Sequence, residues 1–260
     1  MIIDLKDYNL FPIFLVSLLV ILAASEIGRL LGIRHAKDQD GDSVSTLEGA
    51  ILGLLALMIG FTFAMALSRF EARRDAVVNE ANSIGTTALR ARLLPAPHNM
   101  QALKLLREYV QVRLDISRRA PSVSDLNAAV QRSNELQEAL WQQAKAVAAT
   151  NTGIVPTGLF IQTLNVMIDD QAKRLAAIRA QVPNIVFTAL YGVATIAIAF
   201  AGYASGLRAR RSRLPVYITG VIVAAVILLI EDLDRPTAGF IKVSQQPMVD
   251  TAASIASFND

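Results

Sequence analysis

The sequence predicts an all-α integral membrane protein in which two pairs of transmembrane helices flank a helical bundle that lies outside the bilayer and continues from them. Three observations predict this class. The 260 residues are 53% hydrophobic and only 18% charged, which is too apolar for a soluble domain of this size. The apolar residues gather in four stretches close to the 20 or so residues that span a bilayer. The polar remainder shows helical periodicity without strand-like alternation.

The four apolar stretches fall into two pairs separated by a long polar segment. We expect spans at residues 10–33, 47–67, 184–207 and 214–230. The chain then divides into a first transmembrane pair at 1–68, a bundle at 69–183, a second pair at 184–231 and a C-terminal tail at 232–260.

The bundle segment predicts four amphipathic helices that bury their apolar stripes against one another in an antiparallel arrangement. The first helix continues the second span without a break, because neither glycine nor proline occurs from Phe61 to Ile84. The stripes that define three of the helices are Val77, Ala81, Ile84 and Ala88; Leu103, Leu106, Val110 and Leu114; and Phe160, Leu164, Met167, Leu175 and Ile178.

The second span has two distinct apolar faces. One face is bulky and the other is small enough to allow close approach of a neighbouring helix. We interpret the small face as packing within the subunit and the bulky face as lining a pore constriction in an oligomer; the alternative is that the bulky face meets lipid or another helix. The bulky residues are Leu54, Met58, Phe61 and Met65, and the small residues are Gly49, Gly53, Gly60 and Ala64.

Basic residues follow the second span. Phe61, Met65 and Arg69 lie within about 80° of one another on a helix, with Arg73 one turn further. One helix face therefore passes from apolar to basic, which favours anions if that face lines a pore.

Acidic residues close the fourth span. Glu231, Asp232 and Asp234 predict either a cation-attracting ring in an oligomer or a solvated helix end that partners Arg235. The residues alone leave the sign of the ion open. Near the end of the first span, Glu26 and Arg29 share one face, which predicts an intrahelical ion pair or side chains that reach the interface.

Charged loops predict an orientation. The short loop between the third and fourth spans carries Arg208, Arg210, Arg211 and Arg213, and the first loop carries Arg34 and Lys37. Basic residues in short loops favour the cytoplasm. This rule places both loops inside and the bundle outside.

Several functional classes are not expected. The chain has no cysteine, which excludes disulfides and cysteine metal sites. His35 and His98 lie in different loops, and no catalytic glycine motif occurs, so we expect no enzyme, cofactor or metal. Residues 38–42, read as DQDGD, superficially resemble a calcium-binding loop. Their glycine stands at the fourth position of the pattern instead of the sixth, so we do not expect a calcium site. The net charge of +3 is spread along the membrane-flanking segments, so no nucleic-acid partner is expected.

Four sequence runs resemble a known family. Residues 65–74, read as MALSRFEARR, and 78–84, read as VNEANSI, resemble the element that follows the pore-lining second helix of bestrophins. Nearly the whole chain resembles the bestrophin-like group of bacterial membrane proteins, whose C-terminal signature stands here as DLDRP at 232–236 and VSQQP at 243–247.

This resemblance implies a function. Bestrophins are oligomeric anion channels, so it implies a homo-oligomer in the lipid bilayer that conducts small inorganic ions, anions more than cations, through a pore lined by the second span. The bacterial group implies a multi-pass protein of the inner (plasma) membrane. Bestrophins keep the helical domain in the cytosol, opposite to the charge rule. The alternative is a membrane-anchored sensor or scaffold whose bundle binds a partner or ligand.

Overall fold

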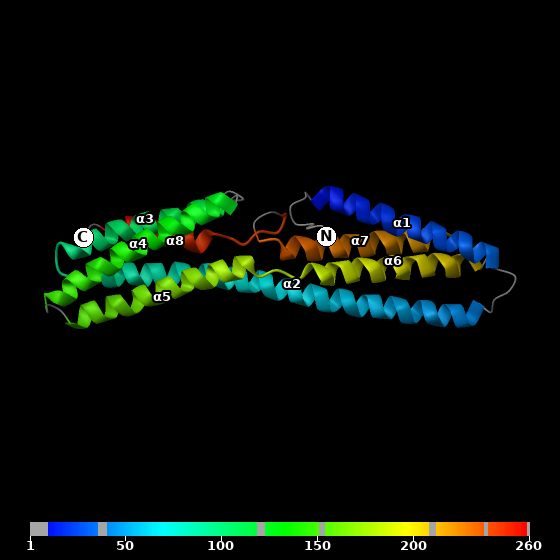
Figure 1. The fold of residues 1–260 in the computed structure, drawn as a ribbon, viewed down its shortest axis with the longest axis horizontal. Coiled ribbons are helices and arrows are strands. Elements are labelled where there is room, and N and C mark those ends of the chain that lie inside the picture. The colour runs from blue at the N-terminus through cyan, green and yellow to red at the C-terminus, as the bar shows by residue number, and fades with distance from the viewer. Residues whose placement is uncertain are drawn as a thin grey trace. The chain divides into compact units, whose positions relative to one another are not determined.

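The described residues of a computed structural model of the chain form eight helices, which confirms the all-α prediction (Figure 1). The structure describes residues 10–35, 41–118, 123–150, 154–207, 212–236 and 239–258. The helices are α1 (Leu10–His35), α2 (Gly41–Ala91), α3 (His98–Arg118), α4 (Val123–Ala149), α5 (Ile154–Arg179), α6 (Asn184–Leu207), α7 (Leu214–Asp234) and α8 (Gln246–Ala256).

Four helical segments are long and apolar enough to cross a membrane. They lie in Leu10–His35, Val44–Ala91, Val155–Leu207 and Leu214–Asp234, and they contain the four expected spans. The chain is therefore a multi-pass membrane protein. The second segment is part of α2, a single helix of 51 residues, so the uninterrupted helix expected from Phe61 to Ile84 is confirmed.

The chain divides into two compact units, which we describe separately. The first, the membrane unit, contains residues 1–69, 181–235 and 239–241. The second, the bundle unit, contains residues 70–180, 236–238 and 242–260. Helix α2 contributes to both.

In the membrane unit, α1 packs against α6 and α7, and α6 also contacts α7. The closest approach is a seam of glycines on α1 and α6. A Cβ added at Gly28 would overlap the carbonyl oxygen of Ala199, and a Cβ at Gly202 would overlap that of Ser25. Gly32 and Gly206 are equally crowded by backbone atoms of the opposite helix. Because only hydrogen fits at these four positions, the two backbones meet directly.

In the bundle unit, apolar residues from α2, α3, α4 and α5 share one core. The stripes expected from periodicity are buried: Ile84, Leu106 and Phe160 are each 0% exposed. The prolines at 95 and 97 follow the end of α2 at Ala91, as expected for residues that cannot continue a helix.

Residues 232–260, which we expected to form a tail, contain a fifth helix of the bundle core. Helix α8 buries Met248, Ala252 and Ile255 in that core. The Thr251 hydroxyl donates to the carbonyl oxygen of Ala81 on α2 at 3.2 Å. Eleven residues give too short a periodic pattern to distinguish a docked helix from a polar tail.

Some sequence-based predictions lie outside the described residues. These are the loop arginines at 208, 210 and 211, Lys37, and most of the calcium-like run at 38–42. The orientation predicted from loop charge therefore rests on the sequence.

Candidate functional site

The membrane part of α2 has one buried stripe. Leu55, Thr62 and Ala66 are at most 3% exposed, and their spacing places them on one side of the helix. The remaining circumference is largely exposed in the chain. Helix α2 therefore offers most of its apolar surface to whatever surrounds a single chain in the membrane.

The bulky face expected to line a pore is part of this exposed surface. Leu54 is 53% and Phe61 67% exposed, while Met58 and Met65 are half-buried. This face lies about a quarter of a turn from the buried stripe. Its residues are available to a neighbouring subunit, to lipid or to a pore.

The small face of α2 does not pack within the subunit, which corrects our expectation. A Cβ built at Gly49, Gly53 or Gly60 would meet no atom of the described chain within 4 Å, and Ala64 is exposed. The face lies nearly opposite the buried stripe, so the contacts of α2 in the membrane unit are made on its other side. The close-packing glycines are instead those of the α1–α6 seam.

The two arginines after the span differ from each other. Arg69 is partly exposed, and its buried Nε has no hydrogen-bond partner among the described residues. Arg73 is only 3% exposed. The expected continuous basic face is therefore wrong at Arg73, because its position returns to the side of α2 that carries the buried residues Ala66 and Glu80.

The acids at the end of α7 are buried rather than arranged as an open ring. The carboxylate of Asp232 accepts hydrogen bonds from the backbone N–H groups of Phe240 (2.8 Å) and Ile241 (2.9 Å). Asp234 accepts from the backbone N–H of Val182 at 2.8 Å. These hydrogen bonds connect the end of α7 to the backbone at residues 240–241 and at Val182. The expected ion-attracting role is not supported for either residue.

Glu231 is also buried, at 6% exposure. One carboxylate oxygen accepts from the hydroxyl of Tyr191 on α6 at 3.0 Å. The side chain links α7 to α6 within the membrane unit and does not face outward as a ring would require.

Glu26 pairs with α7 and not with Arg29. Its carboxylate accepts a hydrogen bond from the hydroxyl of Tyr217 and lies 3.7 Å from Nη1 of Arg213. Of the two alternatives that the sequence left open, the intrahelical ion pair is therefore wrong. Tyr217 of α7 and Arg213 just before it are the partners of the carboxylate instead.

Sequence reasoning missed a charged network in the core of the bundle. Glu80 of α2 is fully buried and accepts from Nε of Arg113 on α3 at 2.6 Å and from Nη1 of Arg174 on α5 at 2.6 Å. Arg174 also donates to Oε1 of Gln245 at 3.0 Å. Buried charges are stable only when they are paired, so this network fixes α2 against two helices and the segment before α8.

Neutral polar groups extend the network to α4. The amide of Gln137 donates to Oε1 of Gln171 at 2.6 Å, and the hydroxyl of Tyr109 lies 2.8 Å from the same oxygen. Burial, followed by the charge of Glu80, raises the pKa of Tyr109 above its ordinary value. Tyr109 therefore remains protonated and able to donate.

No group of three or more His, Cys, Asp or Glu side chains in the described part of the chain is arranged to hold a metal ion. The candidate functional features of the described residues are the exposed faces of α2, the partly exposed Arg69 and the polar interior of the bundle.

Comparison with known proteins identifies what the chain resembles as a whole. A family model of the Bestrophin-like domain matches residues 14–248. A crystal structure of a bacterial bestrophin homologue from Klebsiella pneumoniae with a tyrosine-to-alanine mutation superposes with a TM-score of 0.68 at 15% identity, covering 93% of this chain and 97% of that one. A second structure of a bacterial bestrophin homologue from Klebsiella pneumoniae superposes with a TM-score of 0.65 at 16% identity, covering 95% of this chain and 96% of that one. No curated protein matches the chain.

Proposed function

The chain belongs to the Bestrophin-like family, and we propose that it forms a homo-oligomeric channel that conducts small inorganic ions through a pore lined by the membrane part of α2. Bestrophins, which the sequence resembles, are oligomeric anion channels. We propose further that anions pass in preference to cations.

The observation that carries this proposal is the exposure of α2. A helix buried on all sides could not line a pore, whereas α2 leaves Leu54 and Phe61 more than half exposed. Three helices (α1, α6 and α7) pack together without enclosing these faces. Repeated around a symmetry axis, such faces would form an apolar constriction of the kind that gates by dewetting.

The charges favour anions over cations. Asp232 and Asp234 accept hydrogen bonds from backbone amides of their own chain, which argues against an open cation-attracting ring. Arg69 follows the apolar face and is partly exposed. A ring of such guanidinium groups would raise the local anion concentration.

The proposal is tested by ion flux from liposomes that contain purified protein, with chloride and potassium gradients imposed separately. We expect chloride efflux to exceed potassium efflux. Arg69→Gln should reduce this preference, whereas Arg74→Gln, on a different side of α2, should change it less.

Light scattering in detergent tests assembly independently of conduction. We expect a homo-oligomer of uniform size; a protein that remains monomeric at all concentrations would rule out a shared pore. If folded, oligomeric protein conducts neither ion, the membrane-anchored sensor or scaffold becomes the better description of its role.

A further inference from the structure

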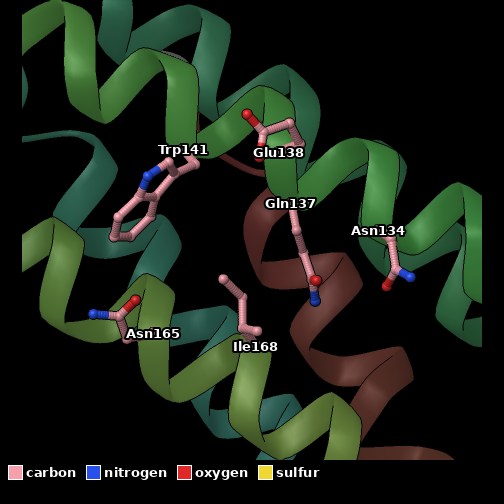
Figure 2. A pocket seen from close by; sticks show the side chains of 6 residues that line it. All are labelled: Asn134, Gln137, Glu138, Trp141, Asn165 and Ile168. Carbon is pink, nitrogen blue, oxygen red and sulfur yellow. The ribbon is translucent and has the colours of Figure 1, made fainter.

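A cavity of about 300 Å³ that is open to solvent lies between α4 and α5 in the bundle unit. Figure 2 shows Trp141 and Gln137 extending from α4 and Ile168 from α5 toward a common space. The six side chains that line it are Asn134, Gln137, Glu138, Trp141, Asn165 and Ile168. The volume is at the lower end of the range of about 300–1,000 Å³ that is typical of small-molecule sites.

One wall of the cavity is held in place by the buried network. Gln137 is only 8% exposed, and its amide donates to Gln171 at 2.6 Å. Gln171 donates in turn to Oδ1 of Asn134 at 3.1 Å. These amides are already held in place by hydrogen bonds to one another. Binding a ligand would therefore cost less conformational entropy, because these side chains need not be ordered on binding.

The apolar wall is also anchored. Trp141 and Ile168 are partly buried and pack against the bundle core, while the rest of each side chain lines the cavity. The indole ring therefore offers a supported aromatic face. Such a face attracts cations through the quadrupole of the ring.

The formal charge of the lining has one sign. Glu138 supplies a carboxylate, which also accepts a hydrogen bond from the amide of Gln142, and none of the six lining residues is basic. Asn134, Gln137 and Asn165 add amide groups that can both donate and accept hydrogen bonds. An anion would find no countercharge here, whereas a cation would find a carboxylate and an aromatic ring.

We propose that this cavity is a binding site for a small organic cation, an ammonium compound with a compact apolar body and a hydrogen-bonding group. The apolar body contacts Trp141 and Ile168, the charge is balanced by Glu138, and the polar group bonds to the amides. This proposal does not depend on ion conduction, so its test and that of the channel are independent.

Trp141 provides a direct readout, because it is the single tryptophan of the chain. The full-length protein in detergent is titrated with choline while tryptophan fluorescence is recorded. The control ligand is 3,3-dimethyl-1-butanol, which has the same shape without the charge. We expect a saturable fluorescence change with choline and none with the alcohol at the same concentrations.

Two matched variants test the charge. Glu138→Gln should weaken choline binding about two- to fivefold, because it removes the one carboxylate of the lining and an exposed ion pair contributes about that much. Glu135→Gln changes an exposed carboxylate of the same helix that pairs with Arg132, and it should leave binding unchanged. Both positions are exposed, so both variants should fold.

Three results would overturn the proposal: a change that does not saturate, an equal response to choline and the neutral alcohol, or equal choline affinity in wild type and Glu138→Gln. Calorimetric titration of Trp141→Phe with choline guards against an optical artefact. Retained but weaker binding in this variant supports the site, whereas binding as strong as in wild type argues against the aromatic contact.

Discussion

Nε of Arg113 lies 2.6 Å from Oε1 of Glu80, and neither side chain is more than 4% exposed. The second carboxylate oxygen of Glu80 accepts from Arg174. One carboxylate on α2 is therefore shared by guanidinium groups from two other helices of the bundle. Glu80 therefore adds a charged connection to the apolar contacts that Ile84 and Ala88 of α2 make in the bundle core.

Replacing Glu80 should strongly destabilise the bundle. Glu80→Gln keeps the shape but leaves two buried guanidinium groups without a countercharge, and breaking a buried ion pair in this way costs about 3–5 kcal/mol. Chemical unfolding in detergent, followed by Trp141 fluorescence, measures the change. Glu108→Gln is the control because its pair with Arg132 is exposed, and such pairs contribute little. Similar losses in both variants would contradict the central role of Glu80.

The hydroxyl of Tyr109 should make stability depend on alkaline pH. Its pKa is raised in the folded protein by burial and by Glu80, whereas an unfolded tyrosine ionises near pH 10. The folded state then binds more protons than the unfolded state, so this contribution is complete below about pH 10 and is lost as the pH rises further. Between pH 9 and 11, approximately the range around the pKa of an unfolded tyrosine, Tyr109→Phe should lose less stability than wild type. Parallel pH profiles of the two proteins would refute this.

Glycines in different spans should differ in their tolerance of alanine. Gly28→Ala places a Cβ against the backbone of α6, and such overpacking costs about 1–3 kcal/mol or more. A Cβ at Gly53 meets open space, so Gly53→Ala should be neutral or stabilise the helix by up to about 1 kcal/mol. The thermal unfolding midpoints of the two variants, compared with wild type, measure this difference. An equal decrease of the midpoint in both variants would contradict a close-packed seam restricted to α1 and α6.

The continuity of α2 should make it sensitive to proline. Ala72→Pro removes a helix hydrogen bond and introduces a clash with the carbonyl of Ser68, at a cost of about 3 kcal/mol or more. Ala72 is exposed, so Ala72→Gln should be tolerated and serves as the control. Expression yield and oligomer size report the effect. A proline variant that assembles like wild type would show that an unbroken helix is not required.

Truncating Phe61 should increase ion flux if the bulky face forms an apolar constriction. Phe61→Ala widens the constriction and makes its dewetting less favourable. Leu19→Ala on α1 is the control, because Leu19 is similarly exposed at 66% but lies on another helix. Chloride efflux from liposomes should rise only for Phe61→Ala. Unchanged flux in a correctly assembled variant would place the constriction elsewhere.

The spans and the bundle could be predicted because hydropathy and periodicity are local signals. The stripe around Ile84 and that around Leu106 are buried as their spacing required. The charged network could not be predicted in this way. Glu80 lies in a segment rich in acidic and basic residues, and its partners lie far away in the sequence on α3 and α5.

The glycines show why the small face was misassigned. Gly49 and Gly53 have the same four-residue spacing as Gly28 and Gly32, so all of them favour close helix packing. Gly28 and Gly32 differ from Gly49 and Gly53 in that they face a matching pair of glycines on another helix, Gly202 and Gly206. Close packing depends on complementarity between two helices, which a pattern in one helix does not contain.

The α1–α6 seam also has a consequence for synthesis of the chain. Gly28 contacts the backbone at Ala199, about 170 residues later. At about 5–20 residues per second, the ribosome needs roughly 10 to 30 seconds to make that segment. During this time α1 is in the membrane with its glycine groove unfilled, while the whole segment of the bundle between them emerges. Completion of the membrane unit therefore follows translation of the bundle segment, and a chain truncated before α6 would leave α1 as an unpaired helix for quality control to recognise.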